Sequence, residues 1–539
     1  MSVGDRRAHV RRDDPEGLLD PRTDPGAVAF GPLGAEAGSD LNWFLLLHQR
    51  VQRRAAVSPR YSWWMLWSLL AGLFALNFTF TVFIVALPQV AGEFHTSVTV
   101  LTWTMVGPLL AYGLAAPVLG KTGDVFGHRR LYLVGLVGAM VSAILTALAA
   151  DVGMLLFARA LDGVQGAATG TASGALINMA FAPEERVKAM GWWSLVGAGG
   201  PVIGISLGSP MIATFGWRAL FWLQLGLLAA AVVVVYLLVP RGRGFDDEPP
   251  ADRRRAREEF RRMDWVGSWS LSLSVTALML GLSIGPSVGW TSGWTTATFV
   301  ASGALLALFV HRVRHAAFPF IPAHYFARRN FVMPMVLRAC ANFAYFGAFF
   351  LFPLLMEQGY GYSIPRVGAI AIARPITFAI CSPIAGYVAV RVGERVSAVA
   401  GAAILTGSMG LFALLGPASG TWLIIVALAT AGLGMGVAMP STSSVMANEV
   451  RVSEFGVMLA AQLLAMQVGE VAGIQVLETV RQAVVRQRHL GAAAPGASLL
   501  ATFRLPFVIG AAVAALGLAS SFFLRSVPRP AHEARRRPR

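Results

Sequence analysis

Two carboxylates, Asp162 and Glu470, stand inside long uncharged stretches of this 539-residue chain. Ionisable side chains within a membrane are costly and normally line a path for protons, ions or substrates. Arg159 lies three residues before Asp162, on the same face of a helix. Burial raises the affinity of a carboxyl for a proton, and a neighbouring arginine lowers it. This pair and Glu470 are therefore candidates for proton coupling. The alternatives are a permanently ionised Arg159–Asp162 pair that only stabilises the helices, and simple pairing of Glu470 with an arginine.

Polar residues at helical spacing within an aromatic stretch predict a site for a bulky amphipathic ligand. Arg338, Asn342 and Tyr345 follow this spacing, and phenylalanines surround them. Rings supply contact area while a few polar groups orient the ligand, although most of these rings could equally face lipid or the core. We expect the substrate cavity to be lined by Asn77, Thr81, Arg338, Asn342, Tyr345 and Gln467.

The balance of charge within the uncharged stretches bears on the substrate. Three arginines, Arg159, Arg338 and Arg374, face the two central carboxylates. An anionic or zwitterionic substrate suits this balance better than a lipophilic cation does. The orientation of each arginine is not readable from the sequence.

The composition requires membrane-spanning helices to position these residues. Apolar residues make up 55% of the chain and charged residues only 13%, which excludes a soluble globular protein and a disordered one. One span needs roughly 20 apolar residues. We expect an all-α polytopic membrane protein with 14 transmembrane spans, beginning near residues 65, 98, 131, 154, 189, 219, 265, 293, 332, 364, 396, 421, 456 and 505.

The distribution of basic residues predicts the orientation. With the N-terminus inside, 35 of the 44 Lys and Arg residues fall in inside loops and tails, and six fall in outside loops. This asymmetry follows the positive-inside rule and places both termini in the cytoplasm, in the inner (plasma) membrane of the cell. The net charge of +16 is then a matter of topology and anionic lipid, and we expect no nucleic-acid partner.

A glycine-rich basic loop follows the second expected span, with Gly120, Asp124, Gly127, Arg129 and Arg130 as its key residues. Glycines allow a tight turn between two helix ends, and Asp124 is expected to cap the helix that follows. The arginine pair is expected to anchor at lipid headgroups.

A weaker copy of this loop lies 266 residues later, with Gly386, Arg391 and Gly393 at the corresponding positions. The copy has Val390 where the first loop has its Asp. Repeated halves are typical of a transporter built from two bundles. In the fifth span, a further small-residue pattern comprises Gly200, Pro201 and Gly204.

These patterns together resemble the major facilitator superfamily, in particular its 14-helix drug/proton antiporter branch, over roughly residues 61 to 526. The first loop is similar to the signature loop of that family, with Val125 in place of the expected arginine. The first span departs as well, because Asn77 stands where the family carries an aspartate and cannot bind and release a proton. The glycine-rich loops and the fifth-span pattern are identified as conformational-gating elements through this resemblance.

The resemblance implies two six-helix bundles that rock around a central cavity and export a small molecule in exchange for protons. The expected parts are a cytoplasmic, partly disordered tail (1–62), the N-terminal bundle (63–240), a cytoplasmic linker (241–263), two inserted helices (264–312), a cytoplasmic loop (313–330), the C-terminal bundle (331–526) and a basic tail (527–539).

Other classes of protein fit the sequence less well. There is no ATP-binding signature, and the nine histidines are scattered. The two cysteines allow no disulfide framework or metal cluster. We therefore expect no enzyme activity, no cofactor and a monomer whose partners are its substrate, protons and lipid. An uptake symporter or facilitator, and a transport-inactive sensor on the same fold, remain the alternatives.

Overall fold

The computed structural model describes residues 60–96, 98–101, 103–239, 258, 261–262, 264–316, 318–489 and 496–526. The expected N-terminal tail, apart from residues 60–62, and the expected C-terminal tail lie outside the described residues. So does the linker 241–263, apart from residues 258, 261 and 262.

Long helices account for nearly all of the described chain. Within the described residues there are fourteen α-helices of 20 residues or more and no strand. Eleven of the described helical segments are long and apolar enough to cross a membrane. The helices and short turns run in the order α2 (Tyr61–Glu93), α3 (Val98–Leu101), α4 (Trp103–Phe126), α5 (His128–Ala147), α6 (Val152–Ala180), α7 (Arg186–Phe215), α8 (Arg218–Leu238), α10 (Trp265–Val288), α11 (Gly293–His315), α12 (Ala323–Phe326), α13 (Arg329–Leu354), η1 (Leu355–Gly359), α14 (Ile364–Ala371), α15 (Ala373–Val392), α16 (Glu394–Ala413), α17 (Thr421–Ala447), η2 (Val452–Glu454), α18 (Phe455–Gln487) and α19 (Gly496–Ser521).

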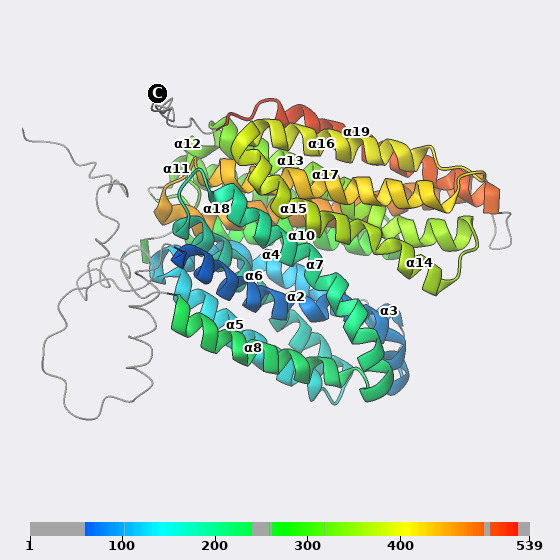
Figure 1. The fold of residues 1–539 in the computed structure, drawn as a ribbon, viewed down its shortest axis with the longest axis horizontal. Helices are drawn as coiled ribbons and strands as arrows, with labels where there is room; N and C mark the ends of the chain where they lie inside the picture. Colours follow the sequence, from blue (N-terminus) through cyan, green and yellow to red (C-terminus); the bar gives the residue numbers. More distant parts are fainter. Residues whose placement is uncertain are drawn as a thin grey trace, which may run out of the picture. The chain divides into compact units, whose positions relative to one another are not determined.

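The helices α2 to α8 pack among themselves and form what we call the first half. Within it α2 lies against α7 and α8, α4 against α6, and α5 against α6 and α8. Hydroxyl groups join neighbouring helices, because Tyr132 of α5 donates to the carbonyl oxygen of Leu69 (2.7 Å) and Ser142 to that of Ala158 (2.9 Å). Figure 1 shows these helices, coloured blue to green, grouped together.

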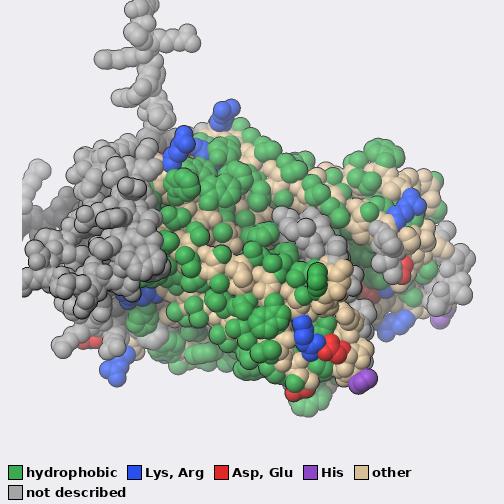
Figure 2. All heavy atoms as spheres, turned by 60° about the horizontal axis from the view of Figure 1, so that its bottom comes forward, with side chains coloured by type: hydrophobic (Ala, Val, Ile, Leu, Met, Phe, Trp, Pro, Cys, Tyr) green, Lys and Arg blue, Asp and Glu red, His purple; other side chains and the backbone are tan. Residues whose placement is uncertain are grey.

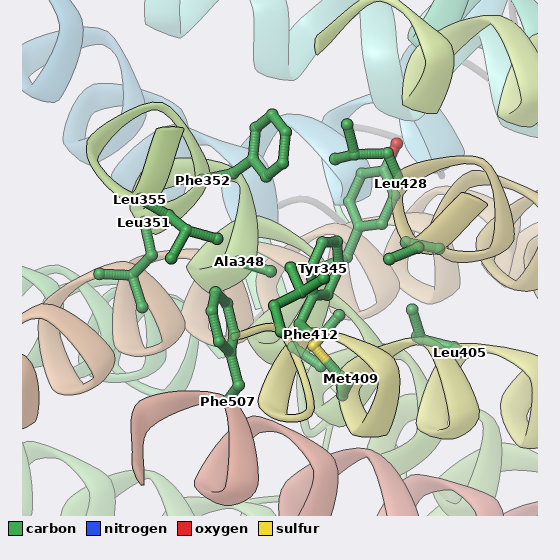
Figure 3. Packing of buried hydrophobic residues seen from close by; sticks show 14 of the residues in the cluster. Tyr345, Ala348, Leu351, Phe352, Leu355, Leu405, Met409, Phe412, Leu428 and Phe507 are labelled. Carbon is green, nitrogen blue, oxygen red and sulfur yellow. The ribbon is translucent and has the colours of Figure 1, made fainter. Parts of the chain in front are cut away.

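The helices α13 to α19 form the second half. Here α13 packs against α18 and α19, and α17 packs against α15 and α16. Aromatic side chains fill the space between them, with the rings of Phe412 and Phe507 stacked at 5.2 Å and Phe352 edge-on to Phe412 at 6.2 Å (Figure 3). This apolar core fixes the backbone of α13, which carries three of the expected substrate residues.

The two halves meet along α18, which packs against α4 and α6, and along α7, which packs against α15 and α17. Between the halves in sequence, α10 and α11 form a hairpin joined by reciprocal hydrogen bonds of Ser274 and Ser302, each hydroxyl donating to the other residue's carbonyl oxygen at 2.9 Å. Of the two, α10 also packs against α4 and α18, so it contacts both halves.

The surface of the helices is suited to lipid. Figure 2 shows one face covered by hydrophobic side chains, with charged side chains at its margins. Large apolar side chains such as Trp294 and Phe215 (each 77% exposed) and Leu414 (73%) project outward. Such extensive exposure of apolar groups would be unfavourable in water, and it agrees with a multi-pass membrane protein.

Candidate functional site

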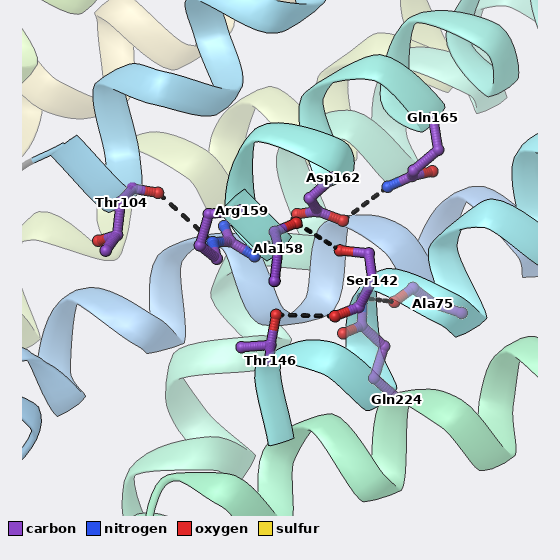
Figure 4. Close-up of polar contacts among 9 residues, drawn as sticks. All are labelled: Ala75, Thr104, Ser142, Thr146, Ala158, Arg159, Asp162, Gln165 and Gln224. Carbon is purple, nitrogen blue, oxygen red and sulfur yellow. Dashed lines mark hydrogen bonds and ion pairs between the residues drawn. The ribbon is translucent and has the colours of Figure 1, made fainter. Parts of the chain in front are cut away.

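Arg159 and Asp162 form an ion pair within α6. Nη1 of Arg159 donates to Oδ2 of Asp162 at 2.8 Å, and Nε2 of Gln165 donates to the other carboxylate oxygen at 2.6 Å (Figure 4). The Arg159 side chain is 1% exposed and that of Asp162 is 17% exposed. Nε of Arg159 also donates to the carbonyl oxygen of Thr104 in α4, at 3.4 Å. Both carboxylate oxygens of Asp162 therefore have a donor within α6.

A close helix contact fixes the position of this pair. A Cβ atom at Gly163 would lie 2.1 Å from the carbonyl oxygen of Pro108, so only glycine allows α6 to approach α4 so closely. On the next turns of the same face, Tyr112 of α4 covers Gly166 and Gly170. The ion pair therefore stands on a rigid seam between α4 and α6.

Glu470 lies in the middle of α18 and differs from Asp162 in its surroundings. It is partly exposed, and within the described part of the chain it makes no hydrogen bond or ion pair. On either side of it, Gly469 and Gly473 press against the backbone of α13 at Ala339 and Phe343. The carboxylate is thus held on a fixed helix without a donor of its own.

Arg374 of α15 is the charged group that interacts electrostatically with Glu470. It is 3% exposed, and its guanidinium carbon lies 3.4 Å from the ring centroid of Tyr345 and 4.8 Å from that of Phe349. Its Nε and Nη1 groups are buried without a hydrogen-bond partner. The sequence placed Arg374 in a span but did not show which way its side chain points, so Arg374 was not among the expected site residues.

Arg338 and Asn342 are brought together in a second buried network. Nη1 of Arg338 donates to Oγ of Ser443 at 2.9 Å, and this hydroxyl donates to Oε1 of Gln462 at 3.3 Å. Nδ2 of Asn342 donates to the carbonyl oxygen of Arg338 at 2.7 Å. Ser443 and Gln462 were missed in the sequence, because an uncharged polar residue in an apolar helix gives no signal of its partner. Tyr345 lies one turn further along α13, under Arg374.

The remaining expected cavity residues are placed separately. Gln467 faces α4 next to Gly113, with its Oε1 buried and without a partner. Nδ2 of Asn77 donates to the carbonyl oxygen of Leu73 in its own helix, at 2.9 Å. Thr81 lies in α2, and its side chain is outside the described residues.

The register between α6 and α18 places the two carboxylates at one depth. Leu459 fits against Gly174, and four residues later Leu463 lies against Gly170, so the helices run antiparallel. Continuing this register by two turns brings Glu470 to the level of Asp162. Each half therefore carries one carboxylate at the same height.

We call the end of the helices at which the two glycine-rich loops lie the loop end. Close contacts between the two halves lie here. At this end Asp124 accepts hydrogen bonds from the backbone N–H groups of Gly456 (2.7 Å) and Val457 (3.1 Å), in the first turn of α18. Nε2 of His128 lies 3.1 Å from the same carboxylate. The expectation that Asp124 caps the helix after it was wrong: Gly127 stands at the N-cap of α5, without a side-chain bond.

Glycines allow the same approach in both halves. A Cβ atom at Gly120 would lie 2.5 Å from the carbonyl oxygen of Gly456, and one at Gly386 would lie 2.7 Å from that of Val187. The turns after them match as well, because Gly127 has φ of 97° and Gly393 has φ of 98°. The repeat seen in the sequence is therefore a repeat of backbone geometry.

The other expected gating residues have diverse surroundings. Arg129 holds the end of α8, with Nε donating to the carbonyl oxygen of Val239 (2.9 Å) and Nη2 to that of Tyr236 (3.0 Å). Arg130 and Arg391 are exposed at the loop end. Three lie within α7, but their packing is outside the described residues: Gly200, Pro201 and Gly204.

Comparison with known proteins identifies the architecture. Residues 69–474 match the model of the Major Facilitator Superfamily. The chain is 26% identical over 430 residues to the multidrug resistance protein Stp of Mycobacterium tuberculosis (strain CDC 1551 / Oshkosh), covering 79% of this chain and 77% of that protein. It is also 26% identical over 415 residues to the tetracenomycin C resistance and export protein of Streptomyces glaucescens, covering 77% and 75%. Among solved structures, the human organic anion transporter MFSD10 (TETRAN) superposes with a TM-score of 0.57 at 16% identity, covering 85% of this chain and 100% of that one.

Proposed function

Because the chain belongs to the Major Facilitator Superfamily, a family of membrane transport proteins rather than enzymes, we propose that it exports amphipathic small molecules in exchange for protons. The similarity to proteins named for multidrug resistance and for antibiotic export supports the direction of transport. In this proposal the fourteen long helices are fourteen spans in the inner membrane, with the loop end and both termini in the cytoplasm.

The observation that carries the proposal is the absence of any protein donor on Glu470, within the described residues, at the centre of α18. A carboxyl that must bind and release a proton cannot be held permanently as an anion by a guanidinium. Asp162 is paired directly with Arg159 at 2.8 Å, whereas Glu470 interacts with Arg374 electrostatically without a direct contact. We therefore assign the main proton-coupling role to Glu470, with Asp162 and Arg159 as a supporting ion pair.

The proposed transport cycle uses alternating access between the two halves. The close contacts of Gly120 with Gly456 and of Gly386 with Val187 would close the loop end, while the central residues would reach the opposite side. Separation of these contacts would open the cavity to the cytoplasm. A proton that moves inward across 100 mV supplies about 2.3 kcal/mol to this cycle.

The test is transport by the purified protein in liposomes. A chemically diverse panel of fluorescent lipophilic cations, neutral compounds and zwitterions would be offered with and without an imposed pH gradient. We expect uphill movement of some compounds against the proton flux, abolished by a protonophore. Movement in the same direction as protons would instead show a symporter, and binding without movement would show a sensor.

A further inference from the structure

Arg374 is a buried cation whose hydrogen-bonding capacity the protein leaves partly unused. Two other buried arginines of the central helices each donate to a side-chain oxygen of a neighbouring residue, Arg159 to Asp162 and Arg338 to Ser443, although Nε of Arg338 has no partner either. Nε and Nη1 of Arg374 have no partner, although the side chain is only 3% exposed. An unsatisfied buried donor costs about 1–3 kcal/mol, and more on a charged group. A carboxylate is the ligand group that best satisfies such donors, since it accepts hydrogen bonds and offsets the charge.

Glu470 is the matching group of opposite sign. It interacts electrostatically with Arg374, yet the two form no ion pair. A direct ion pair between them would neutralise both charges within the protein and leave neither for a ligand. Because they remain apart, each is available to a different end of one ligand.

The aromatic surroundings of Arg374 define the body of the ligand. Its guanidinium carbon lies over the Tyr345 ring, 3.4 Å from the ring centroid, and Phe378 packs edge-on against the same tyrosine at 5.9 Å. Gly432 of α17 holds α15 in place, since a Cβ atom there would lie 2.1 Å from the carbonyl oxygen of Arg374. With Phe349 also 4.8 Å from the guanidinium carbon, the surroundings of Arg374 are aromatic, and a ligand with a planar aromatic body suits them.

We infer that the substrate of this site is an aromatic zwitterion, whose carboxylate binds Arg374 and whose ammonium group binds Glu470. The inference rests on the proposed function and names its substrate class. A ligand with only a positive charge would leave the donors of Arg374 unsatisfied and would be repelled by it. A ligand with only a negative charge would meet the same objection at Glu470. Both groups are satisfied together only by a molecule that carries both charges.

The test compares three forms of one ring system. Norfloxacin carries a carboxylate and a protonated amine, its ethyl ester carries only the amine charge, and its N-acetyl derivative carries only the carboxylate. Initial rates of fluorescent compound movement are measured in proteoliposomes at equal concentration, after subtraction of protein-free liposomes. We expect the zwitterion to be carried at least roughly tenfold faster than either derivative, since each lost charge-assisted contact costs about 1.5–3 kcal/mol. Equal or faster carriage of the ester would overturn the inference.

Substitution of the arginine supplies the matching measurement. In Arg374→Gln the rate for norfloxacin should fall about tenfold, to the level of the ester, while the rate for the ester stays unchanged or rises. Arg374→Lys keeps the charge without the planar group and should lie between. The control is Arg366→Gln, because Arg366 also stacks on a tyrosine (Tyr362, 3.9 Å) but is exposed at the end of α14. A loss of all three compounds in Arg374→Gln with unchanged melting temperature would contradict the assigned role.

The outcomes separate this inference from the proposed function. If the variant cannot be purified in folded form, the comparison of the three compounds on the unsubstituted protein decides alone. If other members of the panel move against protons but norfloxacin has no advantage over its derivatives, the zwitterion assignment is wrong and the exporter remains. If no compound moves under any gradient, the proposed function itself fails.

Discussion

Asp124 and Gly456, 332 residues apart, are joined across the two halves by a hydrogen bond of 2.7 Å from the backbone N–H of the glycine to the carboxylate. The carboxylate thus stands at the N-terminal end of α18, where four N–H groups lack partners in their own helix. An acidic cap there is favourable both as a hydrogen-bond acceptor and as a charge against the helix dipole. The stability of the closed loop end therefore depends on a side chain of the opposite half.

We predict that Asp124→Ala weakens closure of the loop end. Loss of the cap removes about 1–2 kcal/mol from this contact, which corresponds to roughly tenfold more of the opened form. The measurement is the rate of maleimide labelling of a cysteine placed at the buried Ala460, in a protein whose Cys340 and Cys381 are replaced. Labelling should accelerate about tenfold.

The control for this prediction is Asp151→Ala. Asp151 also caps a helix, accepting from Met154 at 2.8 Å, but it does so within the first half. This variant should leave the labelling rate unchanged. Equal labelling in both variants would show that the cross-half cap has no influence on closure.

A second prediction concerns the close approach at Gly120. Gly120→Ala places a methyl group 2.5 Å from the Gly456 carbonyl oxygen, so the halves cannot close as described. Transport should fall at least tenfold, while the melting temperature changes little because each half keeps its own core. Gly107→Ala is the comparison, since it lies in the same helix with nothing within 4 Å of the added atom. If both variants transport normally, the contact is not required for the cycle.

A third prediction separates the two carboxylates. Glu470→Gln should abolish uphill transport driven by a pH gradient while lowering the melting temperature less than Asp162→Asn does, because no hydrogen bond or ion pair is lost. Asp162→Asn should instead keep gradient-driven transport and lower the melting temperature. It leaves Arg159 buried without its counter-charge, at a cost of about 3 kcal/mol of unfolding free energy. Thermal melts and gradient-driven uptake on the same preparations decide it. Loss of coupling in Asp162→Asn alone would move the proton site to α6.

A fourth prediction tests the repeated turn. Gly127 and Gly393 have positive φ, a conformation that costs roughly 1–3 kcal/mol for a residue with a side chain. Each glycine-to-alanine variant should therefore lower the free energy of unfolding by a similar amount. Gly410→Ala, in the interior of α16 with nothing within 4 Å, should instead be neutral or stabilising. Unequal losses of unfolding free energy at the two turns would show that the turns share a backbone conformation but not an equal contribution to stability.

The helices were predictable because uncharged stretches of about 20 residues have few other outcomes. Thus α10, α11 and α17 begin at Trp265, Gly293 and Thr421, the residues expected from the sequence. The last helix begins at Gly496, earlier than expected, because its first turns include the exposed Arg504. Hydropathy alone treats such a residue as the edge of a span.

Contacts within one helix were predictable, and contacts between helices were not. The Arg159–Asp162 pair follows from spacing, since residues three apart share a helix face. The stacking of Arg374 on Tyr345 joins α15 and α13, and no periodicity records which helices are neighbours. The same limit explains Asp124, whose expected partner was the nearest helix N-terminus in sequence rather than the nearest in space.

The contacts of α10 have a consequence for the extent of motion. This helix touches α4 and α18 at once, and its hairpin partner α11 is tied to it by Arg312 on Asp264 at 2.7 Å. A helix that contacts both halves must slide along one of them when the halves rotate relative to each other. Its contacts with α18 include the apolar cluster of Met279 and Leu282 with Val471, which depends on van der Waals packing and offers little resistance to sliding. The inserted hairpin of α10 and α11 would then limit the rotation of the two halves. Its removal should increase the range of this rotation rather than abolish it.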